Sequence, residues 1–221
     1  MKSPVAIIDC ATVTQAISCF NKLTHYFERP FSYHHPVQYG MSSLFEIPEN
    51  SGLIILGSLS DVHEKLAWQV ELAEFLKEKI SSGTPTLGIC FGHQLVQDIF
   101  GGSVDLIDAI ERPHQGTRQF TINQDHFNFK AGENFELFVT HNYEVKNLAP
   151  DFISLAQSKQ CQFDAIAHKD LPFLSVQGHP EASKQFVSGH ISKEISDDKF
   201  KKATLDGHRF IERFLEIVDK A

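Results

Sequence analysis

The fold is decided by residues 85–102, which read PTLGICFGHQLVQDIFGG. Residues 85–89 form a short apolar run, typical of a strand buried on both faces of a parallel sheet. Residues 93–100 follow with a helical pattern, and two glycines then end the helix. A strand that passes directly into a helix is the building unit of α/β sheets.

The same alternation extends to both sides of this stretch. On the amino-terminal side, the pattern predicts strands at 5–9 and 53–56, helices at 14–26 and 63–81, and a loop with one strand at most over 29–48. On the carboxyl-terminal side, residues 119–123 and 135–140 alternate like antiparallel strands, 173–177 reads as a strand and 203–218 as a helix. No repeat or long linker interrupts the chain, so we expect one domain over residues 1–221.

The composition excludes several classes of protein. Of the 221 residues, 42% are hydrophobic, which is enough apolar material for a folded core. The net charge of −8 argues against broad binding to nucleic acid or to anionic membranes. No apolar run approaches the roughly 20 residues of a membrane span. The first apolar run ends at Asp9 and is too short for a secretory signal, so we expect a cytoplasmic protein without nucleic-acid or membrane partners.

Three of the four cysteines have a simple interpretation. The spacing of the cysteines does not match the close pairs of a zinc site, and we expect no metal. Cys10, Cys19 and Cys161 are expected to be buried free thiols. Cys90 differs because of its neighbours.

Cys90 lies between Gly88 and Gly92, at the point where the expected strand becomes a helix. Small flanking residues relieve the crowding of such a turn, which lifts one side chain above the carboxyl edge of the sheet. A helix N-terminus favours a thiolate, and the amides of the turn can donate to an oxyanion. The pattern therefore predicts a nucleophile elbow. A buried cysteine in a glycine-flanked turn is the alternative.

A second chemical motif follows the strand expected at 173–177. His179 stands at the end of this strand, where it could act as a base for a thiol. Glu181 is two residues further on, so its side chain projects on the same side of an extended segment and could orient the imidazole. A surface turn that carries one of the chain's twelve histidines is the alternative.

Taken together, residues 88–94 and 176–181 resemble the two signature motifs of the class I (triad) glutamine amidotransferases. The resemblance implies an open, mostly parallel central sheet flanked by helices, with a smaller antiparallel strand region, as in flavodoxin-like α/β folds. It also implies that Cys90 is the nucleophile, that His179 is the general base and acid, and that Glu181 orients His179. Gln94 matches the glutamine that helps to bind substrate.

Two further segments resemble the family. Residues 52–59 are similar to its apolar strand that ends in Gly-Gly-Pro, with Gly57 at the substrate and the Ser58 and Phe91 amides as the implied oxyanion hole. Ser58 stands where the second glycine is usual and Leu59 where the proline is, and a position with positive φ would tolerate serine poorly. Residues 140–145 resemble the segment that lines the glutamine site. The substrate-binding residues there are His141, Asn142 and Tyr143.

The resemblance implies hydrolysis of the glutamine side-chain amide to glutamate and ammonia, without a metal or an organic cofactor. The elements between the motifs are most similar to stand-alone domains like the glutaminase domain of GMP synthetase. We therefore expect a partner synthetase subunit that accepts the ammonia. Two alternatives remain open, namely a stand-alone hydrolase of γ-glutamyl peptides or amides, and a catalytically inactive binding or regulatory homologue.

Overall fold

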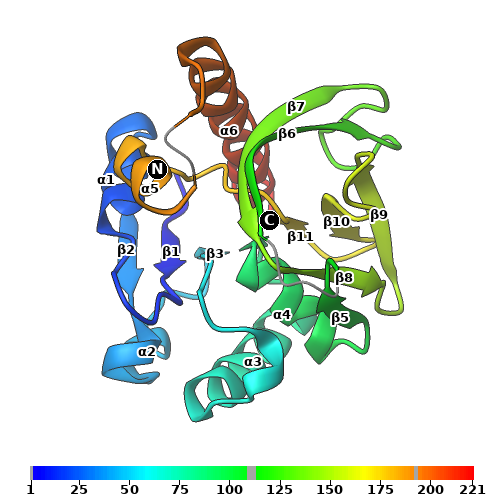
Figure 1. Ribbon diagram of the computed structural model, residues 1–221. Coiled ribbons are helices and arrows are strands. Elements are labelled where there is room, and N and C mark those ends of the chain that lie inside the picture. Colours follow the sequence, from blue (N-terminus) through cyan, green and yellow to red (C-terminus); the bar gives the residue numbers. More distant parts are fainter. Residues whose placement is uncertain (1, 109–112, 192–193) are drawn as a thin grey trace.

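A nine-stranded sheet forms the centre of the computed structural model, which describes residues 2–108, 113–191 and 194–221 (Figure 1). The strand order is β2-β1-β3-β4-β11-β10-β9-β6-β7. The first five strands in this order run parallel, and the last four continue the same sheet in antiparallel pairs. The parallel strands are β1 (Val5–Ile8), β2 (Phe31–His34), β3 (Gly52–Ile55), β4 (Thr86–Ile89) and β11 (Phe173–Val176). The antiparallel strands are β6 (His114–Ile122), β7 (Asn134–His141), β9 (Phe152–Gln157) and β10 (Ala165–His168).

The helices cover both faces of this sheet. They are α1 (Ile17–Tyr26), α2 (Pro36–Tyr39), α3 (Ala67–Ser81), α4 (Phe91–Ile99), α5 (Lys184–His190) and α6 (Asp197–Val218), with 3-10 turns η1 (Ser42–Leu44) and η2 (Val62–Glu64). A separate two-stranded sheet pairs β5 (Ser103–Leu106) with β8 (Tyr143–Asn147). None of the helices in the described ranges is long and apolar enough to cross a membrane.

Alternation along the parallel strands divides the hydrophobic core into two layers. In β1, Val5 and Ile7 pack with α1 and α6, whereas Ala6 and Ile8 pack with α3 and α4. Successive side chains of a strand point to opposite faces of the sheet. Because helices cover both faces, all four residues of β1 are buried. Figure 1 shows α3 and α4 together on one side of the sheet, away from α1 and α6.

The expected sheet architecture is observed, while several element boundaries differ from the expectations. Helix α3 begins at Ala67 instead of residue 63 because Lys65 adopts a left-handed backbone with φ 48°, which ends the preceding 3-10 turn. Helix α1 begins three residues later than expected and α6 six residues earlier. The region 29–48 was expected to be mostly loop, but it contains β2 and α2. The helix after Cys90 begins at Phe91 instead of residue 93.

Candidate active site

Three neighbouring parallel strands bring the sequence motifs together. In register, Ile55 of β3 pairs with Gly88 of β4, and Ile89 of β4 pairs with Val176 of β11. The segments that follow these strands therefore emerge side by side at the carboxyl edge of the sheet. This edge is where open α/β sheets place their ligands. Segments that are far apart in the sequence thus meet at one site.

Cys90 occupies a strained turn between β4 and α4. Its φ of 51° and ψ of −100° lie outside the regions that residues with side chains prefer. The Cys90 amide donates to the carbonyl of Val176 at 2.9 Å, which fixes the turn to β11. A Cβ at Gly88 would lie 2.7 Å from the carbonyl oxygen of Gly92, and a Cβ at Gly92 would lie 2.8 Å from Ile55. The two glycines are therefore required by close packing.

His179 and Glu181 form a buried pair at the end of β11. The His179 Nδ1 atom lies 2.9 Å from Oε1 of Glu181, and the two residues are 3% and 2% exposed. Within the described ranges, no hydrogen-bond partner of normal geometry meets His179 Nε2. Burial acts to lower the pKa of His179, but the charges of Glu181 and Cys90, together with the hydrogen bond to Glu181, outweigh burial and raise the pKa to about 10. The imidazole thus has one nitrogen held by a carboxylate, and its other nitrogen is buried without a hydrogen-bond partner among the described residues.

Gly57 packs closely against His179 and Cys90. A Cβ at Gly57 would lie 3.0 Å from Cε1 of His179 and 3.5 Å from Cβ of Cys90, so His179 and Cys90 flank the same glycine. Ser58 is not among the described residues with positive φ, so its side chain causes no backbone strain. Leu59 is 74% exposed. Ser58 and Leu59, which replace the family's second glycine and its proline, therefore do not require a left-handed backbone.

Gln94 of α4 and the residues around the end of β7 form another wall of the site. Gln94 Nε2 donates to the carbonyl of Tyr143 at 2.7 Å and to Oε1 of Gln177 at 3.2 Å. His141 Nδ1 donates to the same Tyr143 carbonyl at 2.9 Å. Burial, assisted by the charge of Arg118, lowers the pKa of His141 to about 2, so the imidazole is neutral. These contacts place Gln94, His141 and Tyr143 in one network.

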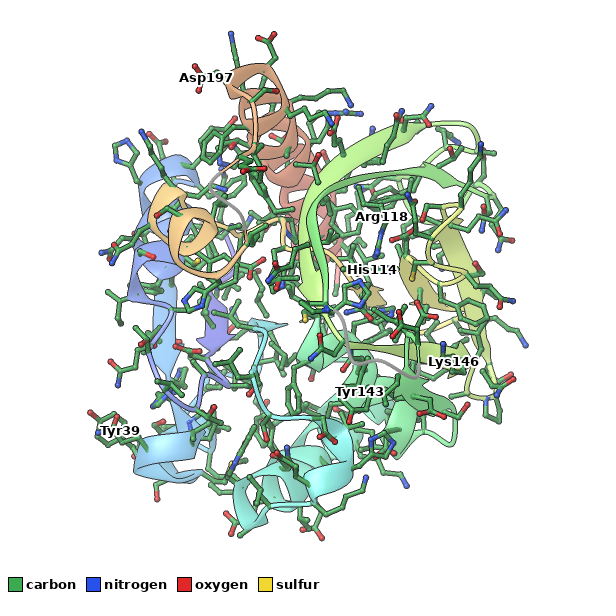
Figure 2. The ribbon with its side chains drawn as sticks, in the orientation of Figure 1. Tyr39, His114, Arg118, Tyr143, Lys146 and Asp197 are labelled. Carbon is green, nitrogen blue, oxygen red and sulfur yellow. The ribbon has the colours of Figure 1, made fainter. Side chains whose placement is uncertain are left out.

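A buried ion pair supports this wall, and no motif in the sequence marks it. Arg118 of β6 contacts Oδ1 of Asp164 at 2.7 Å, and its Nη1 donates to Nε2 of His141 at 2.9 Å. Figure 2 labels Arg118 and His114, which both belong to β6, and shows Tyr143 below them in this view. Arg118 is 5% exposed and Asp164 is 1% exposed. Arg118 lies one residue before the strand expected at 119–123, so no pattern in the sequence distinguished it.

One cavity of about 560 Å³ connects these residues. Its lining includes Gly57, Ser58, Cys90, Gln94, His141, Asn142, Tyr143, His179 and Glu181. The cavity is thus lined by every expected catalytic, oxyanion-hole and substrate-binding residue except Phe91, which begins α4 next to Cys90. The structure adds a wall that the sequence analysis missed, made by residues 11–16 and by Gln185, Phe186 and His190 of α5.

The remaining cysteines and the acidic residues do not form a second centre in the described part of the chain. Cys10, Cys19 and Cys161 are buried free thiols, as expected. Among the residues that the structure describes, no group of three or more His, Cys, Asp or Glu side chains could hold a metal ion.

Comparison with known proteins gives a consistent family assignment. The model of the family described as "Glutamine amidotransferase class-I" matches residues 7–196. A GMP synthase subunit of Methanospirillum hungatei JF-1, described as glutamine-hydrolyzing, is 32% identical over 174 residues, which are 78% of this chain and 76% of that protein. Gamma-glutamyl peptidase 4 of Arabidopsis thaliana is 26% identical over 190 residues, covering 79% of this chain and 74% of the relative.

The matched portion varies among other curated relatives, from 52% to 77% of the relative's length. Among solved structures, the glutamine amido transferase from Methylobacillus flagellatus superposes with a TM-score of 0.74. The alignment covers 100% of this chain and 95% of that one at 18% identity. At this level of identity the similarity supports the α/β fold alone.

Proposed function

Because this chain belongs to the class I glutamine amidotransferase family, we propose that it hydrolyses the side-chain amide of glutamine through a γ-glutamyl thioester on Cys90. The observation that carries the proposal is the arrangement of His179. Its Nδ1 is held by Glu181, and the buried Nε2 remains for the thiol in the cavity that Cys90 lines. A nucleophile, a base and a group that orients the base are the three parts of a catalytic triad.

In the first half of the reaction, the thiolate of Cys90 attacks the side-chain carbonyl carbon of glutamine. The Ser58 and Phe91 amides donate to the oxyanion, where loss of one donor costs roughly 3–4 kcal/mol. The imidazolium of His179 then gives its proton to the departing nitrogen, and ammonia leaves. The high pKa of His179 supports this role because the ring carries the proton at neutral pH.

In the second half, neutral His179 takes a proton from water, and the water oxygen attacks the thioester carbonyl. The carbon–sulfur bond breaks and glutamate is released. Cys90 is restored as the thiolate and His179 as the imidazolium. One water is consumed for each glutamine, and Glu181 holds the ring in one orientation throughout.

The α-amino and α-carboxylate groups of glutamine bind at the wall formed by Gln94, Asn142 and Tyr143. These residues line the same cavity as Cys90 and His179. Gln94 is held in place by the Tyr143 carbonyl and by Gln177. His141 is neutral, so it fixes the Tyr143 carbonyl without adding a charge to the site.

The decisive experiment measures the release of ammonia and glutamate from glutamine. Wild-type protein is expected to turn over glutamine, and Cys90→Ser is expected to abolish turnover. Cys161→Ser is the matched control because Cys161 is also a buried free thiol but does not line the cavity. Equal activity in wild type and Cys90→Ser would contradict the proposal. Tight binding of another small molecule without turnover would favour the inactive regulatory homologue.

The proposal extends to the fate of the ammonia, which is passed to a partner synthetase. The relatives named as one subunit of a glutamine-hydrolyzing GMP synthase support a separate acceptor protein. Addition of the acceptor protein with its nucleotide substrates is expected to accelerate glutamine hydrolysis many-fold. An unchanged rate in a complex shown to form would contradict coupling to that partner.

The size of the cavity favours a second candidate, the hydrolysis of γ-glutamyl peptides or amides. Cavities of about 300–1,000 Å³ hold ligands of drug size, and the cavity of about 560 Å³ extends to residues 11–16 and to Gln185 of α5. The relative named Gamma-glutamyl peptidase 4 supports the same chemistry. The kcat/KM values for glutamine and for γ-glutamyl dipeptides separate the two functions. A large preference for dipeptides would replace the ammonia-producing function with this one.

A further inference from the structure

Helix α1 contacts the backbone on both sides of Glu181. Lys22 Nζ donates to the carbonyl of Ala182 at 2.8 Å and also reaches the carbonyl of Pro180 at 3.4 Å. One turn earlier on the helix, the Ser18 hydroxyl lies 2.8 Å from the Ser183 hydroxyl. Residues four apart share one face of a helix, so Ser18 and Lys22 act together on this segment.

The segment that carries Glu181 has further contacts on both sides of the residue. His179 donates its amide to the carbonyl of Phe138 at 2.7 Å, and Ala182 donates to the carbonyl of His179 at 3.3 Å. On the other side, Gly207 of α6 packs so closely that a Cβ there would lie 2.5 Å from the carbonyl oxygen of Pro180. Lys22 thus holds the segment from α1 while Gly207 supports it from α6.

The charge of Lys22 also matches its surroundings. Burial lowers the pKa of Lys22, whereas the charges of Glu181 and Cys19 act to raise it. Among the described residues, His208 of α6 also interacts with Lys22, and its own pKa falls to about 4, chiefly through burial and also through the charge of Lys22. A partly buried cation therefore interacts electrostatically with the carboxylate that contacts His179, while His208 is neutral.

We infer that Lys22 is a positioning residue that holds Glu181 against His179 by binding the carbonyls of Pro180 and Ala182. The inference rests on the proposed function, in which Glu181 orients His179. Lys22 itself does not line the cavity in the described part of the chain, so it acts through the segment and does not touch the substrate.

The test compares Lys22→Met, which removes the charge and the donors, with Lys22→Arg, which keeps both. Lys77→Met is the matched control because Lys77 is exposed on α3. Lys22→Met is expected to lower kcat for glutamine about 10-fold or more while KM stays within about twofold, since misplacement of a catalytic group affects the chemical step. Lys22→Arg is expected to restore most of kcat, and Lys77→Met to leave both constants unchanged. A proportional change in KM, or a kcat equal to wild type in Lys22→Met, would overturn the inference.

A second measurement does not depend on turnover. In protein with ¹⁵N-labelled histidine, the Nδ1 proton of His179 reports its hydrogen bond to Glu181 by NMR, and His179→Asn identifies the signal. We expect this signal to broaden or disappear in Lys22→Met and to persist in Lys22→Arg and Lys77→Met. An unchanged signal in Lys22→Met would overturn the inference even if wild type hydrolyses glutamine. If wild type lacks turnover but the signal responds as expected, the proposed function fails and the positioning role stands.

Discussion

Arg118 donates a hydrogen bond from Nη1 to Nε2 of His141 at 2.9 Å, and this contact determines the tautomer of the histidine. Because a guanidinium only donates, Nε2 must accept, and the proton lies on Nδ1. The Nδ1 atom then donates to the carbonyl of Tyr143 at 2.9 Å, the carbonyl that also holds Gln94. A buried cation on β6 thus orders the wall where substrate is proposed to bind.

Replacement of this cation is expected to affect both stability and substrate binding. Arg118→Met leaves Asp164 buried without its partner, which costs about 3–5 kcal/mol of unfolding free energy. The KM for glutamine is expected to rise because His141 loses its fixed orientation. Urea unfolding and steady-state kinetics measure the two effects. Lys169→Met, which breaks the exposed pair with Asp151, is the control and is expected to cost at most about 1 kcal/mol. Equal losses in the two variants would contradict this role of burial.

The carboxylate of Glu181 is expected to matter for turnover more than for binding. Glu181→Gln keeps the size of the side chain but removes the charge that raises the pKa of His179. We expect kcat to fall about 10²–10⁴-fold, the range of general acid–base contributions, with KM little changed. Glu78→Gln on the exposed side of α3 is the control. A Glu181→Gln enzyme within about threefold of wild-type kcat would exclude an orienting role for this residue.

The elbow is expected to tolerate no side chain at Gly92. A Cβ there would lie 2.8 Å from both the Cβ and the carbonyl oxygen of Ile55, so β3 or α4 must shift. Gly92→Ala is expected to cost about 1–3 kcal/mol in thermal or urea unfolding and to reduce turnover. Gly189→Ala provides the comparison, because a Cβ on that residue of α5 would meet no described heavy atom within 4 Å. This control should be neutral or more stable by up to about 1 kcal/mol, and a similar loss in both variants would contradict the packing argument.

Stability is expected to fall as the pH drops below about 6.5. Burial lowers the pKa of His93 to about 3 and that of His141 to about 2, with Arg118 adding to both shifts. Between about pH 6.5 and 3 the unfolded chain therefore binds protons that the folded chain does not, which removes about 1.4 kcal/mol per pH unit for each histidine.

Urea titrations at several pH values measure this slope. His93→Gln is expected to remove one histidine's contribution to the slope of the unfolding free energy with pH. This change in slope is separate from any loss of stability that the variant shows at pH 7. His179 acts in the opposite direction, because its raised pKa contributes stability below about pH 6.5 that is lost as the pH rises toward 10. An identical acid slope in His93→Gln and wild type would contradict the assignment.

Local patterns were sufficient for the elements next to the chemistry. Short apolar runs predicted β1, β3, β4 and β11, because a strand buried on both faces needs apolar residues throughout. The predicted helix boundaries were wrong where capping and backbone conformation determine the end of the helix. Lys65 adopts a left-handed backbone and α6 begins after Ser196, and no apolar period in the sequence marks either position.

By itself, the sequence determined the α/β alternation, the turn at Cys90 and the family, because glycine spacing and apolar runs are local properties of the chain. Only the tertiary structure decided which distant residues support the site. Arg118 reaches Asp164 and His141, and Lys22 reaches the segment around Glu181, across long separations in sequence. Contacts of this kind depend on strand order and helix placement, since a single buried arginine or lysine has no periodic signal that reveals its partner.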